Sequence, residues 1–141
     1  MIVWLAKFHA GFFETDVSGL WPAGSYWDLQ RPHRLAAMEN IEAESDLERD
    51  LIAFASDFDS EIKKCAFQTI IHGDAKVENF CFSETGEVAG LDFQWVGKGT
   101  GLRDLMCLIS SCIKSEELIQ KSLDFYFVSL SEKVENYAKI T

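Results

Sequence analysis

The sequence has few cysteines, and their arrangement does not suit a structural metal site. Its four cysteines, Cys65, Cys81, Cys107 and Cys112, form no Cys-x-x-Cys pair, and no histidine lies at ligand spacing from them. Structural zinc sites are built from such closely spaced pairs. We therefore expect no zinc centre, and we expect reduced, buried thiols at Cys81, in a predicted strand, and Cys107, in a predicted apolar helix.

Positive charge is also scarce. The chain has 13 Lys and Arg against 23 Asp and Glu, which gives a formal net charge of −10. Binding to nucleic acid depends on clustered Lys and Arg that neutralise phosphates. Binding to an anionic membrane surface needs the same residues. The composition therefore predicts that the protein binds neither nucleic acid nor a membrane.

Long apolar segments are missing as well. No apolar run approaches the ~20 residues that a membrane span needs. The first residues, MIVWLAKFHAGFF, include Lys7 and His9 and lack the basic leader and small-residue cleavage site of a signal peptide. These features predict a cytoplasmic protein. With 48% hydrophobic residues in 141, the chain is expected to form a single folded domain over residues 1–141.

The hydrophobic periodicity predicts mainly helices. The clearest is an amphipathic helix over Ser45–Lys64, which opens with the capping-box pair Ser45 and Glu48. Its apolar residues recur at steps of three and four: Leu47, Leu51, Ala55, Phe58 and Ile62. Further helices are expected over residues 2–13, 102–112 and 115–137, a turn-rich loop over 14–33, and a strand over 68–71.

The chemically informative stretch is Ile70–Gln94, IIHGDAKVENFCFSETGEVAGLDFQ. Its short apolar runs at 80–82 and 88–91 flank a turn that contains Gly86, which predicts a β-hairpin. With a two-residue loop at Thr85-Gly86, Phe80 would face Leu91 and Asn79 would face Asp92. Asp74 would open into the same space. Carboxylate and carboxamide oxygens are hard ligands that suit Mg²⁺.

The segment HGDAKVEN resembles the catalytic loop of the protein kinase-like fold, and LDFQ resembles its metal-binding Asp-Phe-Gly segment. Because His-Gly precedes Asp74 and Gln94 replaces the glycine, the match is closer to the aminoglycoside and choline kinase group. Within that group it is closest to the ecdysteroid kinase-like (CHK kinase-like) branch. The resemblance extends over roughly residues 3–128. It implies an α+β, mainly α-helical C-lobe with a small β-hairpin, catalytic loop 72–79 and metal-binding segment 91–94.

The resemblance also implies roles for single residues. Asp74 would accept or orient the proton of the attacking hydroxyl. Asn79 and Asp92 would hold Mg²⁺ on ATP, and Lys76 would neutralise the transferring phosphoryl group and help to bind ATP. His72 would shape the loop, and Asp104 would brace it through backbone hydrogen bonds. For Lys76, a simple solvent-exposed lysine is the alternative.

A complete kinase of this type has elements that do not fit in this chain. No room exists for the β-rich N-lobe, and Gly97-Lys98-Gly99-Thr100-Gly101 matches neither Gly-x-Gly-x-x-Gly nor the P-loop pattern. We therefore expect a C-lobe that is truncated at both ends. One hypothesis is an ATP-dependent kinase of a small hydroxylated molecule. The alternative is a non-catalytic binding or interaction module, whose exposed lobe face a protein partner would cover. A metal-dependent hydrolase is disfavoured, because no further acidic or histidine ligand is supplied.

Overall fold

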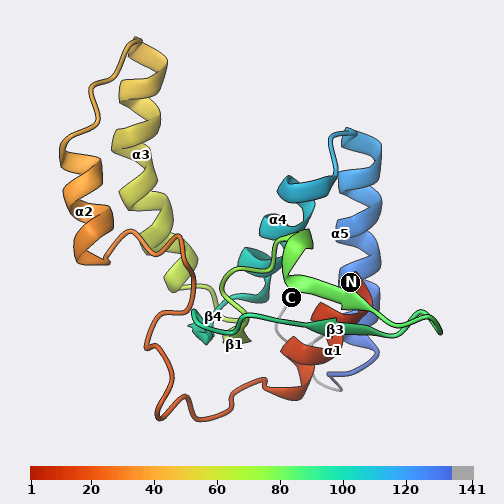
Figure 1. Cartoon of the computed structure of the whole chain (residues 1–141). Coiled ribbons are helices and arrows are strands. Elements are labelled where there is room, and N and C mark those ends of the chain that lie inside the picture. Colours follow the sequence, from red (N-terminus) through yellow and green to blue (C-terminus); the bar gives the residue numbers. More distant parts are fainter. Residues whose placement is uncertain (135–141) are drawn as a thin grey trace. The chain divides into compact units, whose positions relative to one another are not determined.

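The computed structural model describes residues 1–134. The chain forms two compact units, each with most of its residue contacts within itself (Figure 1). The first unit contains Met1–Tyr26 and the chain from Ala66 onward; the second is Trp27–Cys65. Within the described part of the chain there are five α-helices and two small antiparallel sheets. This composition confirms the expected α+β, mainly helical fold. The predicted end of the last helix near residue 137 lies outside the described residues.

The first unit holds three helices, α1 (Ile2–Gly11), α4 (Gly101–Cys112) and α5 (Glu116–Ser131). Its strands pair in two sheets of two: β1 (Thr69–Ile71) with β4 (Gly97–Gly99), and β2 (Phe80–Phe82) with β3 (Val88–Gly90). A short 3₁₀ turn, η1 (Val77–Asn79), leads into β2. The helices near 2–13, 102–112 and 115, and the strand near 68–71, are thereby confirmed.

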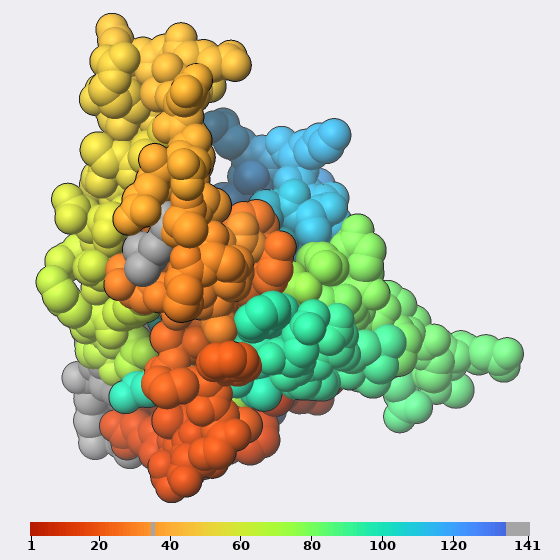
Figure 2. All heavy atoms as spheres, turned by 60° about the vertical axis from the view of Figure 1, so that its left-hand side comes forward, coloured from red at the N-terminus to blue at the C-terminus, as the bar shows by residue number. Residues whose placement is uncertain are grey.

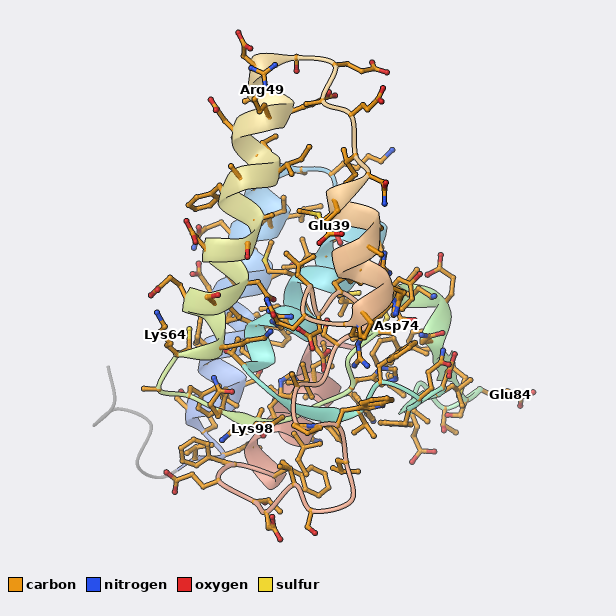
Figure 3. The ribbon with its side chains drawn as sticks, turned by 90° about the vertical axis from the view of Figure 1, so that its left-hand side faces the viewer. Glu39, Arg49, Lys64, Asp74, Glu84 and Lys98 are labelled. Carbon is orange, nitrogen blue, oxygen red and sulfur yellow. The ribbon has the colours of Figure 1, made fainter. Side chains whose placement is uncertain are left out.

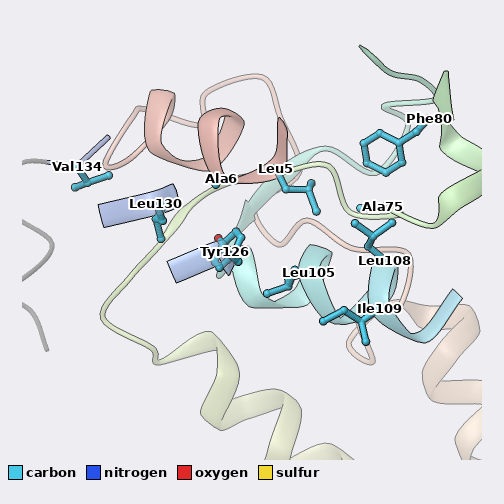
Figure 4. Packing of buried hydrophobic residues seen from close by; sticks show 10 residues of the cluster. All are labelled: Leu5, Ala6, Ala75, Phe80, Leu105, Leu108, Ile109, Tyr126, Leu130 and Val134. Atoms are coloured by element: carbon cyan, nitrogen blue, oxygen red, sulfur yellow. The ribbon is translucent and has the colours of Figure 1, made fainter. Parts of the chain in front are cut away.

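The hydrophobic core of this unit lies between α1, α4 and α5, with Ala75 and Phe80 at one end (Figure 4). Leu5, Leu105 and Leu130 are completely buried there. Each such side chain contributes about 1.5–3 kcal/mol of burial free energy. Ala75 lies in the predicted catalytic loop, so the core anchors that loop directly. The other members of the cluster are Ala6, Leu108, Ile109, Tyr126 and Val134.

The predicted register of the hairpin is wrong by one residue. Phe80 pairs with Gly90, not with Leu91, and Phe82 pairs with Val88. The loop therefore has three residues, Glu84-Thr85-Gly86, and Gly86 closes it at φ +83°. This is the three-residue hairpin in which the last position adopts a left-handed conformation. As a result Leu91 N–H donates to Asn79 O at 2.8 Å, and Asp92 lies one residue beyond the paired position.

The expected burial of Cys81 is also wrong. It is exposed, not buried as expected. Side chains alternate between the two faces of a strand, so turning Phe80 into the core points Cys81 away from it. All four cysteines are free thiols. Among the residues that the structure describes, no helix is long and apolar enough to span a bilayer.

The second unit is a pair of helices, α2 (Pro32–Glu39) and α3 (Asp46–Lys63). The sequence predicts α3 correctly, and Ser45 Oγ caps it by accepting from Glu48 N–H at 3.2 Å. In a complete capping box the Glu48 side chain would accept from Ser45 N–H. Here Glu48 Oε2 accepts from Glu44 N–H instead. Helix α2 was not foreseen; it begins at Pro32, a residue whose fixed φ suits the first helical position.

Candidate active site

The predicted catalytic loop begins directly after β1, where the backbone passes through a position that only glycine tolerates. Gly73 has φ +87°, and a Cβ there would lie 2.3 Å from Trp95 O and 2.8 Å from Ser25 N. Its carbonyl accepts a hydrogen bond from Tyr26 N–H at 2.7 Å. The loop is therefore clamped between the segments around residues 25 and 95, which sets the direction in which Asp74 leaves β1.

The carboxylate of Asp104, near the start of α4, holds the backbone of this loop. Its Oδ2 accepts from His72 N–H at 2.6 Å and its Oδ1 accepts from Gly73 N–H at 2.9 Å. Asp104 is almost completely buried. Hydrogen bonds to a buried carboxylate are stronger than bonds between neutral groups, so one side chain fixes two successive peptide groups.

His9 and Tyr126 extend this contact into the core. His9 Nε2 lies 3.1 Å from Asp104 Oδ2, and His9 Nδ1 lies 2.8 Å from the Tyr126 hydroxyl. His9 comes from α1 and Tyr126 from α5, and both are buried. The close approach needs Gly101, where a Cβ would lie 2.3 Å from the Tyr126 hydroxyl. His9 lies in the predicted helix over residues 2–13, but the sequence gives no signal that Tyr126 is its partner.

His72 connects the loop to the segment that carries Asp92. Its Nε2 lies 2.7 Å from Leu91 O, and its Nδ1 accepts from Asp74 N–H at 3.3 Å. A carbonyl can only accept, so the imidazole carries its proton on Nε2. The ring centroid lies 4.5 Å from that of Phe93. His72 therefore ties Leu91-Asp92-Phe93 to the backbone of Asp74.

One carboxylate oxygen of Asp74 contacts both Lys76 and Asn79. Lys76 Nζ and Asn79 Nδ2 each lie 3.0 Å from Asp74 Oδ2, and Asn79 Nδ2 also donates to Asp74 O at 2.8 Å. Asp74 and Asn79 are buried, whereas the Lys76 side chain is 45% exposed. Figure 3 labels Asp74 within this part of the unit. The structure thus brings three of the predicted site residues into direct contact.

Asp92 is close enough to Lys76 for its charge to affect the pKa of that lysine. The hydrogen bond to Asp74 and the charge of that carboxylate raise the pKa of Lys76, and the charges of Glu78 and Asp92 add to the increase. Asp92 itself is exposed, and its Oδ2 accepts from Gln94 Nε2 at 3.3 Å. Its φ of +59° is left-handed. Aspartate tolerates that conformation better than most residues, at a cost in strain that is typical of functional sites.

The oxygen donors present fit Mg²⁺ better than a transition metal. The amide nitrogen of Asn79 is committed to Asp74, so its Oδ1 is the atom left to face a cation. Among the described residues no group of three or more His, Cys, Asp or Glu side chains is arranged to hold a metal ion. An all-protein cage is therefore not formed. Mg²⁺ is suited to a site with one carboxylate and one amide, because phosphates and water complete its shell.

Cys107 lies on α4 near the same carboxylates, and its thiol is predicted to react slowly. Burial, together with the charges of Asp74 and Asp104, raises the pKa of Cys107 from 9.0 to about 11. Only the thiolate is nucleophilic. The difference in pKa should lower the thiolate population, and hence the rate of alkylation near neutral pH, about 100-fold relative to an unshifted thiol.

Iodoacetamide labelling followed by peptide mass spectrometry measures this rate. The rate for Cys107 should keep rising with pH until about pH 11, because the thiolate forms only there. Cys65, which is exposed, serves as the control thiol in the same sample. A Cys107 rate that levels off near pH 9 would contradict the assignment.

Comparison with known proteins identifies a protein family. A family model described as the ecdysteroid kinase-like family matches residues 28–138. No curated protein and no solved structure matches the chain. The matched range covers most of the chain, including the loop 72–79 and the segment 91–94, and the α+β fold is consistent with a kinase-like C-lobe. The chain therefore belongs to the ecdysteroid kinase-like family.

Proposed function

We propose that residues 1–141 form a kinase-like catalytic lobe that takes part in ATP-dependent phosphorylation of a hydroxyl on a small molecule. Ecdysteroids, choline and aminoglycosides are the acceptor classes to test. The observation that supports this most is the contact of Lys76 Nζ and Asn79 Nδ2 with the same oxygen of Asp74, on a loop braced by Asp104. Phosphoryl transfer depends mainly on positioning and charge neutralisation, and such a loop provides both.

Asp74 would act on the acceptor. Its backbone is fixed through His72, and its Oδ2 already holds Lys76 and Asn79, so its other oxygen can accept the proton of the acceptor hydroxyl. The hydroxyl oxygen then forms a bond to the terminal phosphorus of ATP while the bond to the ADP oxygen breaks. The proton goes to Asp74, in the manner of a general base.

Asp92 and Asn79 would hold Mg²⁺, the cation that neutralises the nucleotide phosphates when bound. Asn79 supplies an oxygen whose direction is set by the two bonds of its amide nitrogen to Asp74. Asp92 supplies a carboxylate on a segment tied to the loop through His72 and Leu91.

Lys76 would bind the phosphoryl group. A lysine ammonium is charged at physiological pH, the hydrogen bond to Asp74 raises its pKa further, and 45% of the side chain is exposed. An ammonium on a flexible stem can leave Asp74 and contact a phosphate oxygen without a change in the backbone.

The test uses the full chain with Mg²⁺, ATP and a panel of ecdysteroid, choline and aminoglycoside acceptors. ATP binding is measured by calorimetry and phosphorylated product by mass spectrometry. Asp74→Asn should retain ATP binding and lose about 10²–10⁴-fold in the rate of transfer, the usual contribution of a general base. Asp124→Asn, which removes an exposed carboxylate on α5, is the matched control and should leave the rate unchanged.

Two outcomes would overturn the proposal. One is the absence of ATP binding at millimolar concentration, which favours the non-catalytic binding module instead. The other is a transfer rate that Asp74→Asn leaves unchanged, which would place the reaction elsewhere on the chain.

A further inference from the structure

One face of α3 exposes four large apolar side chains in a line. Leu47, Leu51, Phe54 and Phe58 are 69%, 57%, 60% and 53% exposed. We call these four residues the α3 seam. Isolated exposed apolar residues are common on proteins, but a contiguous row on one helix marks an interaction surface. The helix with its projecting side chains is seen in Figure 3, and its surface in Figure 2.

The seam is not the face by which α3 packs in its own unit. That face carries Ile52, Ala55 and Ile62, which are partly buried, and Asp59, which is buried. Lys63 fixes it, because its ammonium lies 2.6 Å from Asp28 Oδ1 and 2.7 Å from Asp59 Oδ2. Partial burial lowers the pKa of Lys63, but the hydrogen bonds and charges of Asp28 and Asp59 together raise it above its ordinary value. Of the apolar residues from which the sequence predicts this amphipathic helix, only Ala55 and Ile62 lie on that face.

The spacing of the four seam residues favours a helix as the binding partner. The four positions follow one another at steps of four, three and four residues, which is the a/d pattern of a coiled coil. Such a row presents its side chains along a nearly straight line to a second helix, because its three steps span 11 residues, close to three turns of a helix with 3.6 residues per turn. A β-strand or an extended peptide would match only alternate contacts.

The charges beside the seam favour a partner helix of one charge sign. The positions that flank a coiled-coil seam, e and g, are here Glu48 and Ala55 on one side and Asp50 and Asp57 on the other. No basic residue occupies them. Arg49 points to the far side of the helix and pairs with Asp46 at 2.6 Å. Residues at e and g positions determine partner choice through opposite charges.

A second copy of the chain fits this surface poorly. An antiparallel pair of α3 helices would oppose Asp50 and Asp57 of one copy to the same residues of the other. Each whole chain also carries a net charge of −10. Like charges placed in this way disfavour association and specify a different partner.

We propose that the α3 seam is a docking site for a basic amphipathic helix of another protein. In the complex, apolar side chains of the partner would pack between the four seam residues. Its Lys or Arg side chains would pair with Glu48, Asp50 and Asp57. The seam shares no residue with the loop that carries Asp74, and the proposal does not depend on catalysis.

Two synthetic helical peptides of about three heptads test the proposal on the full chain. Both have Leu at a and d; one has Lys at e and g, and the other has Glu. Fluorescence anisotropy should show that the Lys peptide binds at least about tenfold more tightly than the Glu peptide, with an affinity that falls as salt rises.

Variants locate the binding and exclude general stickiness. Phe54→Ser should abolish binding of the Lys peptide, whereas Phe125→Ser, at a similarly exposed phenylalanine on α5, should not change it. The double variant Asp50→Lys with Asp57→Lys should reverse the preference in favour of the Glu peptide. Circular dichroism checks that each variant keeps its helix content.

Three results would overturn the proposal: failure of both peptides to bind, equal binding of both, or equal loss with Phe54→Ser and Phe125→Ser. Sedimentation of the chain alone gives a further check. A dimer that Phe54→Ser dissociates would assign the seam to a second copy instead.

Discussion

Asp104→Ala is expected to lower the free energy of unfolding of the first unit by about 3–5 kcal/mol, the usual cost of removing one partner from a buried charged network. The substitution leaves His72 N–H, Gly73 N–H and His9 Nε2 without the acceptor that all three now share. Whole domains are stable by only about 5–15 kcal/mol, so the variant should be marginally folded.

Urea unfolding followed by circular dichroism measures the change. Asp104→Asn should cost less than Asp104→Ala, because the amide keeps one oxygen as an acceptor but turns an NH₂ group toward the other donor. Asp124→Ala, at an exposed aspartate on α5, is the control and should stay within about 0.5 kcal/mol of the parent chain. An equal, small effect of Asp104→Ala and Asp124→Ala would show that the loop does not depend on this brace.

Asp92→Asn is expected to remove the Mg²⁺-dependent part of ATP binding. The substitution deletes a full negative charge from the proposed metal site, and we expect affinity for the Mg²⁺ complex of ATP to fall at least about tenfold, or about 1.4 kcal/mol. Asparagine is chosen because it tolerates the left-handed backbone of this position, where φ is +59°. Alanine would confound loss of the ligand with backbone strain.

Calorimetric titrations with and without EDTA separate the two contributions to binding. In EDTA the parent chain and Asp92→Asn should bind ATP alike, since no cation then links the carboxylate to the phosphates. With Mg²⁺ only the parent should gain affinity. Equal affinity of both proteins for the Mg²⁺ complex would remove Asp92 from the metal site.

Local signals in the sequence were sufficient for several elements of this fold. Helix α3 was predictable because Ser45 caps it through a side-chain bond that involves only residues three apart. The strand before His72 was predictable because β-branched residues precede a glycine that the turn requires. In each case the determining interaction is local, so the pattern alone carries it.

Other features depend on contacts that a linear pattern does not contain. Gly86 can close either a two-residue or a three-residue loop, so the sequence alone does not determine which residue pairs with Phe80. Because the loop has three residues, Phe80 pairs with Gly90, and Asp92 lies one residue beyond the position that faces Asn79. Tyr126 meets His9 across 117 positions of sequence, and only the packing of α1 on α5 joins them. The apolar residues of α3 likewise did not reveal which face packs, because the helix is apolar on more than one side.

The resemblance of the motif to a kinase loop predicted that Asp74, Lys76 and Asn79 belong to one site, but not that Lys76 and Asn79 contact the same oxygen of Asp74. The resemblance also led us to expect that Asp104 braces this loop, but the sequence did not show the close backbone approach that requires glycine at position 73. Glycine at position 73 and the buried carboxylate of Asp104 orient the loop before any ligand arrives. This preorganisation is what the proposed chemistry needs, because charge stabilisation is most effective when the groups do not have to rearrange.

The most direct test of the proposed site is paramagnetic broadening in the ¹⁵N-labelled full chain, with Mn²⁺ added in the presence of ADP. Mn²⁺ takes the same hard oxygen ligands as Mg²⁺ and broadens nearby amide signals. We predict that the signals of Asn79, Leu91 and Asp92 are lost first, and that Asp92→Asn prevents the effect. Broadening that begins elsewhere, for example around Glu14 and Asp16, or that is independent of both ADP and Asp92, would contradict a nucleotide-linked metal site at this loop.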